Sequence, residues 1–227
     1  STLTWLLEGA IHHKDSLGSD QIIGPGSVNW MTAGSGVVHS ERTPAHLRDG
    51  GIYPVHGYQV WVALPKEKEH MPAEFHHVAA KDLPYWEESG VQMRLVAGSF
   101  GSQKSPVPVY SPLYMMEWNT EKPASINPDA RFFGEWGISV VEGGFSTCGE
   151  RIGPGNMLVA KPGAPCQFDL EAGSHLLVFG GDPFPEERFI YWNFVASTQE
   201  RLEQAKQDWQ TGKFKLIPGE GDPIRLI

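Results

Sequence analysis

A short sequence pattern occurs twice in this chain of 227 residues and constrains its fold more than any other feature. An apolar pair followed by Glu-Gly precedes Gly-Pro-Gly in both copies: Leu6–Gly9 precedes Gly24–Gly26, and Val140–Gly143 precedes Gly153–Gly155. Gly-Pro-Gly alone arises by chance, but two motifs in the same order with alignable flanks favour duplication. The two motifs are separated by 14 residues in the first copy and by 9 in the second. The difference predicts a longer hairpin loop at residues 12–21 in the first copy.

Each copy is interpreted as a strand, a hairpin, a strand, a tight turn and a further strand. Short apolar runs such as residues 58–64 and 175–179 lie between scattered breakers, 26 Gly and 18 Pro in all. Runs of this length, rich in β-branched and aromatic residues, predict an all-β fold. We therefore expect two tandem jelly-roll-like barrels. The predicted domains are residues 1–110 and 111–227.

The C-terminal region changes character. A capping box at residues 197–200, with Ser197 as the cap, precedes apolar residues at helical spacing, and Gly212 follows where a helix commonly ends. This pattern predicts one amphipathic helix of about four turns within the second domain. Its apolar stripe is expected to pack on a barrel, and binding to a partner protein is the alternative.

Charge and composition exclude several classes. A formal charge of −9 argues against direct binding to nucleic acid, which needs a basic surface. No run of 18 apolar residues is present, so no membrane span is expected. Cys148 and Cys166 are the only cysteines, and no signal peptide is visible. A disulfide between them is possible, but two cysteines in a chain of this length are no disulfide framework, so we expect a cytoplasmic protein whose reduced cysteines pack as small apolar residues.

His39 and Glu41 are the best candidates for metal ligands. Two residues apart on a strand, their side chains point to one face, and imidazole and carboxylate suit Fe, Mn, Ni or Cu. A His-x-Glu pair without a metal is also common. His12 and His13 are adjacent and diverge, so neither is counted as a ligand. Alignment of the repeats puts apolar residues opposite the pair, which predicts a metal in the first barrel alone.

The chain resembles the pirin family of two-cupin proteins over essentially its whole length. The resemblance is carried by these segments: residues 5–9, 13–18, 24–26, 30–34, 36–41, 56–65 and 192–214. The most specific of them is Trp-Met-Thr-Ala-Gly followed by His-Ser-Glu. The resemblance implies two cupin barrels. It also implies one mononuclear divalent metal in the first barrel, most often iron, with Mn, Ni, Cu or Zn as alternatives.

In this family three His and one Glu hold the metal, and His39 and Glu41 match the last two. The first two belong to a His-Pro-His motif ahead of the strand that opens the chain, so we expect two further ligands upstream of Ser1 and a truncated N-terminus. Trp5, Met31 and His56 are expected to line the substrate pocket. Trp61 is expected to pack in the core.

The resemblance implies an oxidoreductase of the quercetin 2,3-dioxygenase type, acting on a flavonol-like aromatic substrate and O2. Glu41 is then both metal ligand and catalytic base for the substrate hydroxyl. The alternative is a non-catalytic, redox-responsive transcriptional regulator that binds metal and acts through protein partners. A metal-free scaffold is the third interpretation.

Overall fold

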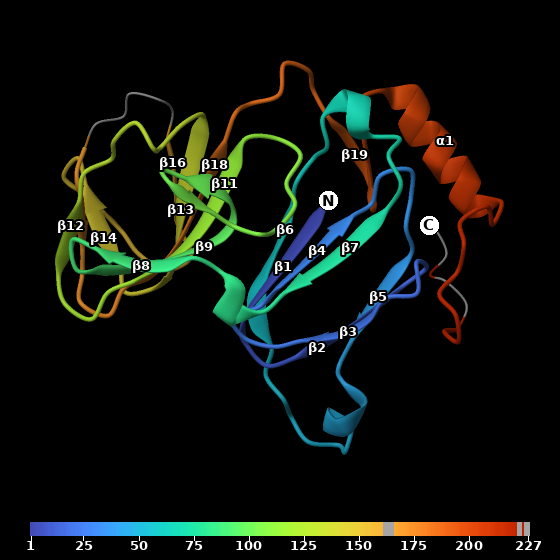
Figure 1. Ribbon diagram of the computed structural model, residues 1–227, viewed down its shortest axis with the longest axis horizontal. Coiled ribbons are helices and arrows are strands. Elements are labelled where there is room, and N and C mark those ends of the chain that lie inside the picture. The colour runs from blue at the N-terminus through green and yellow to red at the C-terminus, as the bar shows by residue number, and fades with distance from the viewer. Residues whose placement is uncertain (161–165, 222–223, 225–227) are drawn as a thin grey trace. The chain divides into compact units, whose positions relative to one another are not determined.

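The computed structural model in Figure 1 describes residues 1–160, 166–221 and 224. The chain forms two compact units. Unit 1 contains residues 1–80 and 184–227, and unit 2 contains residues 81–183. In sequence, unit 2 is therefore inserted between two parts of unit 1.

This division differs from the boundary expected at residue 110. Strand β9 (Val91–Phe100) precedes that boundary, yet it pairs with β11 (Leu113–Asn119) inside unit 2. At the other end, residues 184–227 belong to unit 1. Both limits depend on pairing between distant segments, which local residue patterns do not reveal.

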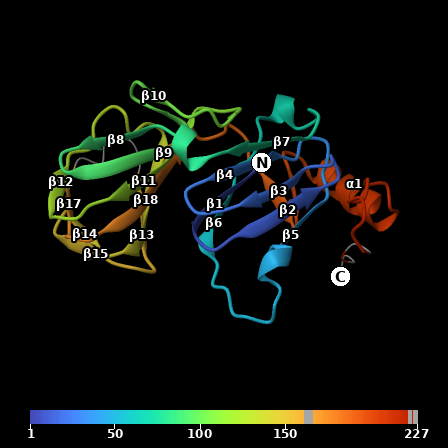
Figure 2. The same cartoon turned by 60° about the horizontal axis from the view of Figure 1, so that its bottom comes forward.

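Two antiparallel sheets of unit 1 lie close together in Figures 1 and 2, and a third is the pair of β19 (Phe189–Tyr191) and β20 (Phe194–Ala196). The first has the strand order β6-β1-β4-β7, and the second has the order β3-β2-β5. The strands of the first sheet are β1 (Thr2–Glu8), β4 (Val28–Thr32), β6 (His56–Trp61) and β7 (Glu74–Val78). Those of the second are β2 (Ile11–Asp15), β3 (Asp20–Ile23) and β5 (His39–Arg42).

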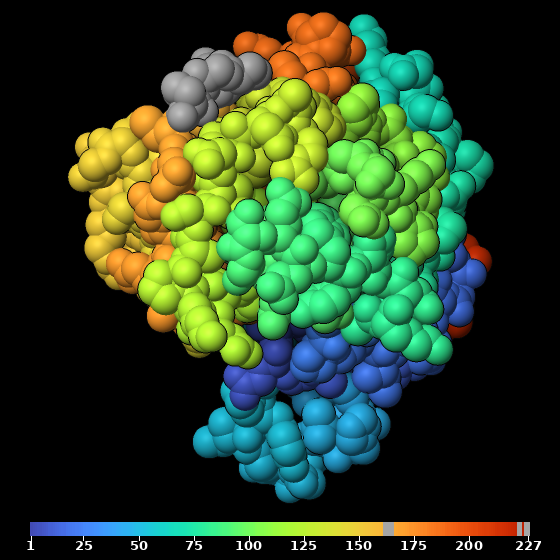
Figure 3. Space-filling model, turned by 60° about the vertical axis from the view of Figure 1, so that its left-hand side comes forward, coloured from blue at the N-terminus to red at the C-terminus, as the bar shows by residue number. Residues whose placement is uncertain are grey.

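Two connections of unit 1 contain 3₁₀ helices. One is η1 (Ala45–Leu47), between β5 and β6, and the other is η2 (Lys66–Lys68), between β6 and β7. The segment that carries η1 stands out from the surface in light blue at the bottom of Figure 3. A third 3₁₀ helix, η3 (Ala80–Asp82), follows β7.

Unit 2 has a sheet of order β10-β9-β11-β18-β13-β16, to which β8 adds beside β9, and a second sheet of order β12-β17-β14-β15. Its remaining strands are β8 (Tyr85–Glu88), β10 (Gln103–Lys104), β12 (Ala124–Ile126), β13 (Glu135–Glu142), β14 (Phe145–Thr147), β15 (Glu150–Ile152), β16 (Met157–Ala160), β17 (Phe168–Leu170) and β18 (His175–Gly181). Aromatic rings in tilted and edge contacts fill its interior, among them Phe132, Trp136 and Phe168. Close packing of this kind makes unit 2 a filled barrel.

The predicted duplication of the turn is confirmed. In both Gly-Pro-Gly turns the third glycine has a positive φ, +75° at Gly26 and +80° at Gly155. In both, the amide after the motif donates to the carbonyl of its first glycine, at 3.3 Å from Ser27 and 3.2 Å from Asn156. Proline second and glycine third are the residues that a type II turn requires. The turn joins β3 to β4 in unit 1 and β15 to β16 in unit 2.

The predicted C-terminal helix is present as α1 (Gln199–Gln210) and contacts β19 (Phe189–Tyr191) and β20 (Phe194–Ala196) in unit 1. Its cap is Thr198, whose hydroxyl accepts from the Arg201 amide at 3.2 Å, so the choice of Ser197 was wrong. Ser197 instead donates to Glu69 at 2.9 Å. Among the described residues, no helix is both long and apolar enough to cross a membrane.

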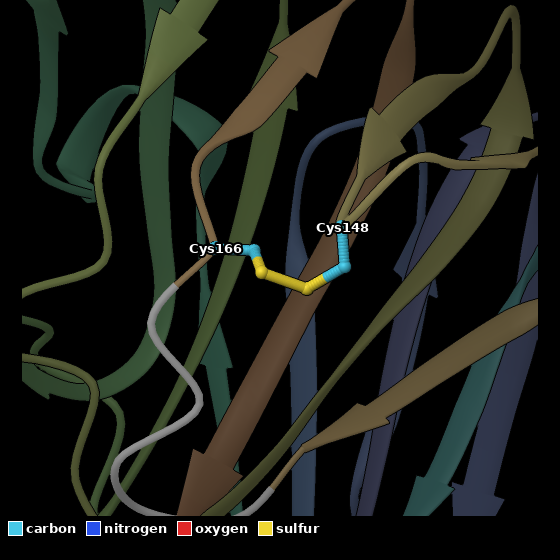
Figure 4. Close-up of a disulfide and its surroundings, with 2 residues drawn as sticks. All are labelled: Cys148 and Cys166. Atoms are coloured by element: carbon cyan, nitrogen blue, oxygen red, sulfur yellow. A yellow bond between two sulfur atoms is a disulfide. The ribbon is translucent and has the colours of Figure 1, made fainter.

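The expectation of reduced, buried cysteines was wrong. Cys148 and Cys166 form a disulfide within unit 2, with their Cα atoms 5.4 Å apart (Figure 4). The bond joins the turn between β14 and β15 to the residues just before β17. Cys148 is exposed, so the pair acts as a cross-link at the surface of the barrel. The expected cytoplasmic location rested partly on free thiols and stays a prediction.

Candidate metal centre

Three side chains that can bind a metal converge in unit 1: His13 on β2, and His39 and Glu41 on β5. One ligand atom from each lies within 4.8 Å of the others. His13 and Glu41 are direct cross-strand neighbours, with 3.9 Å between Nδ1 and Oε1. His39 lies two residues before Glu41 on the same face, as the alternation of a strand requires.

His39 is suited to binding a metal as a neutral imidazole. Its Nδ1 is buried and has no hydrogen-bond partner among the described residues. Burial lowers the pKa of His39 below its ordinary value, and the nearby carboxylate of Glu41 offsets part of this effect. The ring therefore stays uncharged at neutral pH, with an unpaired nitrogen, which is the form that metals bind.

Glu41 is held as a carboxylate by residues of the other sheet. Its Oε1 accepts from the Thr4 hydroxyl at 3.3 Å, and its Oε2 accepts from the Gln59 amide at 2.8 Å. Burial acts to raise the pKa of Glu41, but its interactions with His13 and Gln59 hold the pKa below its ordinary value. The side chain is thus anionic and fixed in direction before any ligand binds.

His13 was missed in the sequence because residues 12–21 were assigned to a loop. In the structure β2 extends to Asp15, so adjacent side chains alternate between the two faces of a strand. His12 points away and contacts Asp20 at 2.5 Å, whereas His13 is 2% exposed and stacks on Phe75 with ring centroids 4.4 Å apart. The prediction that adjacent histidines diverge was right, but one of them reaches the site.

Asp15 fixes the orientation of His13. Its side chain is fully buried, and its Oδ1 accepts from the amides of Leu17, Gly18 and Ser19 at 2.9–3.1 Å. Its Oδ2 lies 3.2 Å from Nε2 of His13. This contact fixes the ring so that its other nitrogen, Nδ1, faces Glu41. A carboxylate on the outer nitrogen of a ligand histidine is a common feature of metal sites.

The three side chains open into one cavity between the sheets. Its walls are formed by eight residues: Thr2, Thr4, His13, Asn29, Met31, His39, Glu41 and Phe75. Polar and apolar residues thus share the walls. The ligand atoms thus lie beside an apolar surface formed in part by Met31 and Phe75.

The expected pocket residues are placed differently from one another. Met31 lines the cavity. Trp5 is fully buried and, by strand alternation, lies on the opposite face of β1 from Thr4. His56 is exposed and pairs with Glu8, so the structure does not bring it to the cavity. Trp61, expected in the core, is 46% exposed.

The equivalent positions in unit 2 are apolar. Phe168 and Leu170, which align with His39 and Glu41, are each 2% exposed and belong to the core. Leu158, which aligns with Asn29, packs against the same core. Unit 2 therefore has a filled interior where unit 1 has its cavity.

The donor set of unit 1 fits a metal ion. Two imidazoles and one carboxylate are the ligands of mononuclear iron oxygenases, and His39 offers an otherwise unpartnered nitrogen. These three residues come from adjacent strands of one small sheet, which holds them without help from a loop.

Comparison with known proteins identifies the family. The Pirin family model matches residues 1–62, and the model of the pirin C-terminal cupin domain matches residues 115–215. A pirin-like protein of Caulobacter vibrioides is 43% identical over 217 residues, which are 95% of this chain and 74% of that protein. The chain belongs to the pirin family. Pirin membership makes both barrels cupin domains, so the expected all-β two-cupin fold with a C-terminal helix is confirmed.

Other pirin relatives extend the likeness. A pirin-like protein of Solanum lycopersicum is 32% identical over 219 residues, 93% of this chain and 72% of that relative. A crystal structure of quercetin 2,3-dioxygenase from Acinetobacter baumannii has 32% identity and a TM-score of 0.88, covering 98% of this chain and 73% of the other. The chain thus spans about three quarters of the length of each.

Proposed function

We propose that this pirin is a metal-dependent dioxygenase that acts on a flavonol-like aromatic substrate. The observation that supports the proposal is the convergence of His13, His39 and Glu41 within 4.8 Å at a partly apolar cavity. The likeness to a solved quercetin 2,3-dioxygenase supports the reaction class. Cupin relatives of this kind suggest a single metal ion, for which we propose iron.

His39 and Glu41 are the proposed ligands that agree with the family resemblance, and the structure adds His13 as a third. The two histidines expected upstream of Ser1 stay a prediction. A bound divalent metal supplies Lewis acidity and redox chemistry to the substrate and O2. The chain itself supplies fixed donor atoms and an apolar wall formed in part by Met31 and Phe75.

Glu41 is the proposed base. Because its pKa is held low, the carboxylate is ready to accept the proton of a substrate hydroxyl at neutral pH. Thr4 and Gln59 hold the two oxygens in place, so the carboxylate keeps its direction while it accepts the proton. The substrate oxygen is then left anionic beside the site of the metal.

Oxygen uptake tests this proposal. The full chain is loaded with Fe²⁺ under nitrogen, its metal content is measured, and oxygen consumption is followed after quercetin and air are added. We expect uptake that depends on iron, with ring-cleavage product found by mass spectrometry. Full occupancy by iron without oxygen uptake would overturn the dioxygenase and favour the non-catalytic regulator.

A matched pair of variants tests the role of Glu41. Glu41→Gln keeps the size of the side chain but removes the base, so turnover should fall at least about 100-fold, while iron is partly retained. Glu117→Gln is the control, because Glu117 also lies beside a histidine, His175, at 3.0 Å, but in unit 2. Equal turnover in Glu41→Gln and the control would exclude Glu41 as the base.

A further inference from the structure

A row of polar side chains crosses the whole first sheet of unit 1. Gln59 on β6 is paired with Thr4 on β1, Thr4 with Asn29 on β4, and Asn29 with His77 on β7. Residues in direct register across adjacent strands point to the same face. Since Thr4 and Asn29 line the metal cavity, this row faces its interior.

The side chains of this row make hydrogen bonds, and one of their polar atoms is left without a partner. Gln59 and Thr4 both bind Glu41. His77 Nδ1 donates to Asn29 Oδ1 at 2.8 Å. Nδ2 of Asn29 is buried without a hydrogen-bond partner among the described residues, and the residue is only 3% exposed. The two amide hydrogens of this cavity-lining residue therefore have no acceptor among the described residues.

Sequence and energetics both mark this atom as unusual. A buried donor without a partner is destabilising, so its presence needs a compensating role. The duplicated barrel shows the alternative, because Leu158 occupies the aligned position and packs against the core of unit 2. An apolar side chain thus suits this point of the fold, and unit 1 has an amide there instead.

The next row along the sheet is mainly apolar. Thr2 is paired with Trp61 on one side and Met31 on the other, and Met31 is paired with Phe75. Met31 and Phe75 thus place apolar side chains next to Asn29 in the wall of the same cavity. The two rows therefore offer an apolar surface and a hydrogen-bond donor side by side.

We propose that Asn29, held in direction by His77, is a binding residue that donates a hydrogen bond from Nδ2 to an acceptor oxygen of the cavity's aromatic ligand. The ligand class is a planar ring system with adjacent hydroxyl and carbonyl oxygens. This inference rests on the proposed function, which it deepens by assigning a second oxygen contact to the substrate. His77 is a positioning residue that acts through Asn29.

Two substitutions of Asn29 separate a donor from a mere filler. Asn29→Asp keeps the acceptor for His77 but replaces the donor with a carboxylate oxygen, and Asn29→Leu imitates the second barrel. Both should weaken binding of quercetin about tenfold or more to the iron-loaded chain under nitrogen, measured by quenching of tryptophan fluorescence. Iron content should stay equal to that of the native chain. Asn156→Asp, in the turn of unit 2, is the control and should bind as the native chain does.

A second probe makes the inference independent of turnover. Tropolone has adjacent hydroxyl and carbonyl oxygens on one small ring and lacks the ring that a flavonol dioxygenase cleaves. Its affinity should fall by a similar factor in both Asn29 variants. The side-chain amide signals of Asn29 in ¹⁵N NMR of the chain loaded with diamagnetic Zn²⁺ should shift when tropolone is added.

The positioning role of His77 has its own readout. His77→Leu should weaken tropolone binding and broaden or move the Asn29 amide signals before any ligand is added. His77→Gln retains a donor near Asn29 and should restore much of the affinity. Equal NMR signals in the native chain and His77→Leu would exclude the positioning role.

The outcomes distinguish this inference from the proposed function. Weaker probe binding in both Asn29 variants, without oxygen uptake by the native chain, would support the inference and overturn the dioxygenase. Oxygen uptake by the native chain, with unchanged probe binding in both variants, would support the dioxygenase and overturn the inference. Loss in Asn29→Leu but not in Asn29→Asp would overturn the donor role, and failure of both probes to bind the native chain would overturn the ligand class.

Discussion

The two carboxylate oxygens of Asp15 contact two different parts of unit 1. Oδ1 binds the three amides of the turn after β2, and Oδ2 binds His13. Burial acts to raise its pKa, but hydrogen bonds from Ser19, His13 and Leu17 hold the pKa below its ordinary value. The charged carboxylate therefore connects the local turn to the direction of a metal ligand.

Replacing Asp15 should loosen the metal site without emptying it. Asp15→Asn alters the contact with Nε2 of His13, so we expect metal affinity to fall about ten- to hundredfold. A chelator competition with Zn²⁺ measures it. Asp20→Asn is a matched control, because Asp20 contacts the neighbouring His12 on the outer face of β2. Equal losses in the two variants would contradict the role given to Asp15.

The histidine of the site predicts a dependence of stability on pH. Burial lowers the pKa of His39, whereas an unfolded chain takes up this proton near the ordinary value of about 6.5. Just below that pH the unfolded state binds more protons, so acidification destabilises the folded metal-free protein. Its thermal midpoint should drop from pH 7.5 to pH 5.5, and the drop should be smaller in His39→Asn. An identical drop in the native chain and in His39→Asn would show that His39 is not the source of the pH dependence.

Local sequence was informative for residues whose geometry depends on one strand alone. His39 and Glu41 were predicted as a pair because alternation fixes their common face. His13 was not, because its use depends on where a hairpin ends and on the register between β2 and β5. Asn29 gave no signal at all, since its proposed role depends on the register of three strands.

At the scale of elements, Glu69 holds the C-terminal segment to the rest of unit 1. It is 7% exposed and lies 3.5 Å from Nε of Arg188 and 3.7 Å from Nε of Arg201, in addition to its bond with Ser197. The sequence predicted the helix but not this attachment. The contact with Ser197 also explains the misassigned cap, because that hydroxyl is already used.

Glu69→Ala should therefore release helix α1. Two guanidinium groups would lose a buried partner, at a cost of roughly 2–3 kcal/mol in the free energy of unfolding. Urea denaturation measures the loss, and limited proteolysis should cleave sooner near residue 199. Glu67→Ala changes an exposed neighbour and should have little effect. Similar stability of both variants would show that the attachment contributes little.

The disulfide acts on unit 2 through the unfolded chain. It closes a loop of 18 residues, for which loop entropy predicts about 3 kcal/mol of stabilisation. Reduction, or replacement of both cysteines by serine, should lower the denaturation midpoint of unit 2 by a corresponding amount. Metal binding by unit 1 should not change. An unaltered midpoint after complete reduction, verified by thiol titration, would contradict this estimate.

At the scale of the whole molecule, the repeat predicted two barrels but not their limits. The strands of each copy lie close together in sequence, so turn motifs and apolar runs reveal them. Residues 184–227 belong to unit 1 and contact Leu64, Glu69 and His70 there. These contacts cannot be predicted from the periodicity of the sequence. Family likeness supplied the fold, and the strand register supplied the site.

The insertion of unit 2 sets an order of events during synthesis. Residues 1–80 leave the ribosome first, but the segment that completes their unit follows only after all of residues 81–183. Until then Glu69 lacks both arginines. Once the inserted unit has folded, a rigid body replaces a long flexible loop, which reduces the entropy lost when the last segment docks. We therefore expect unit 2, the barrel without the metal site, to fold first and to favour the completion of unit 1.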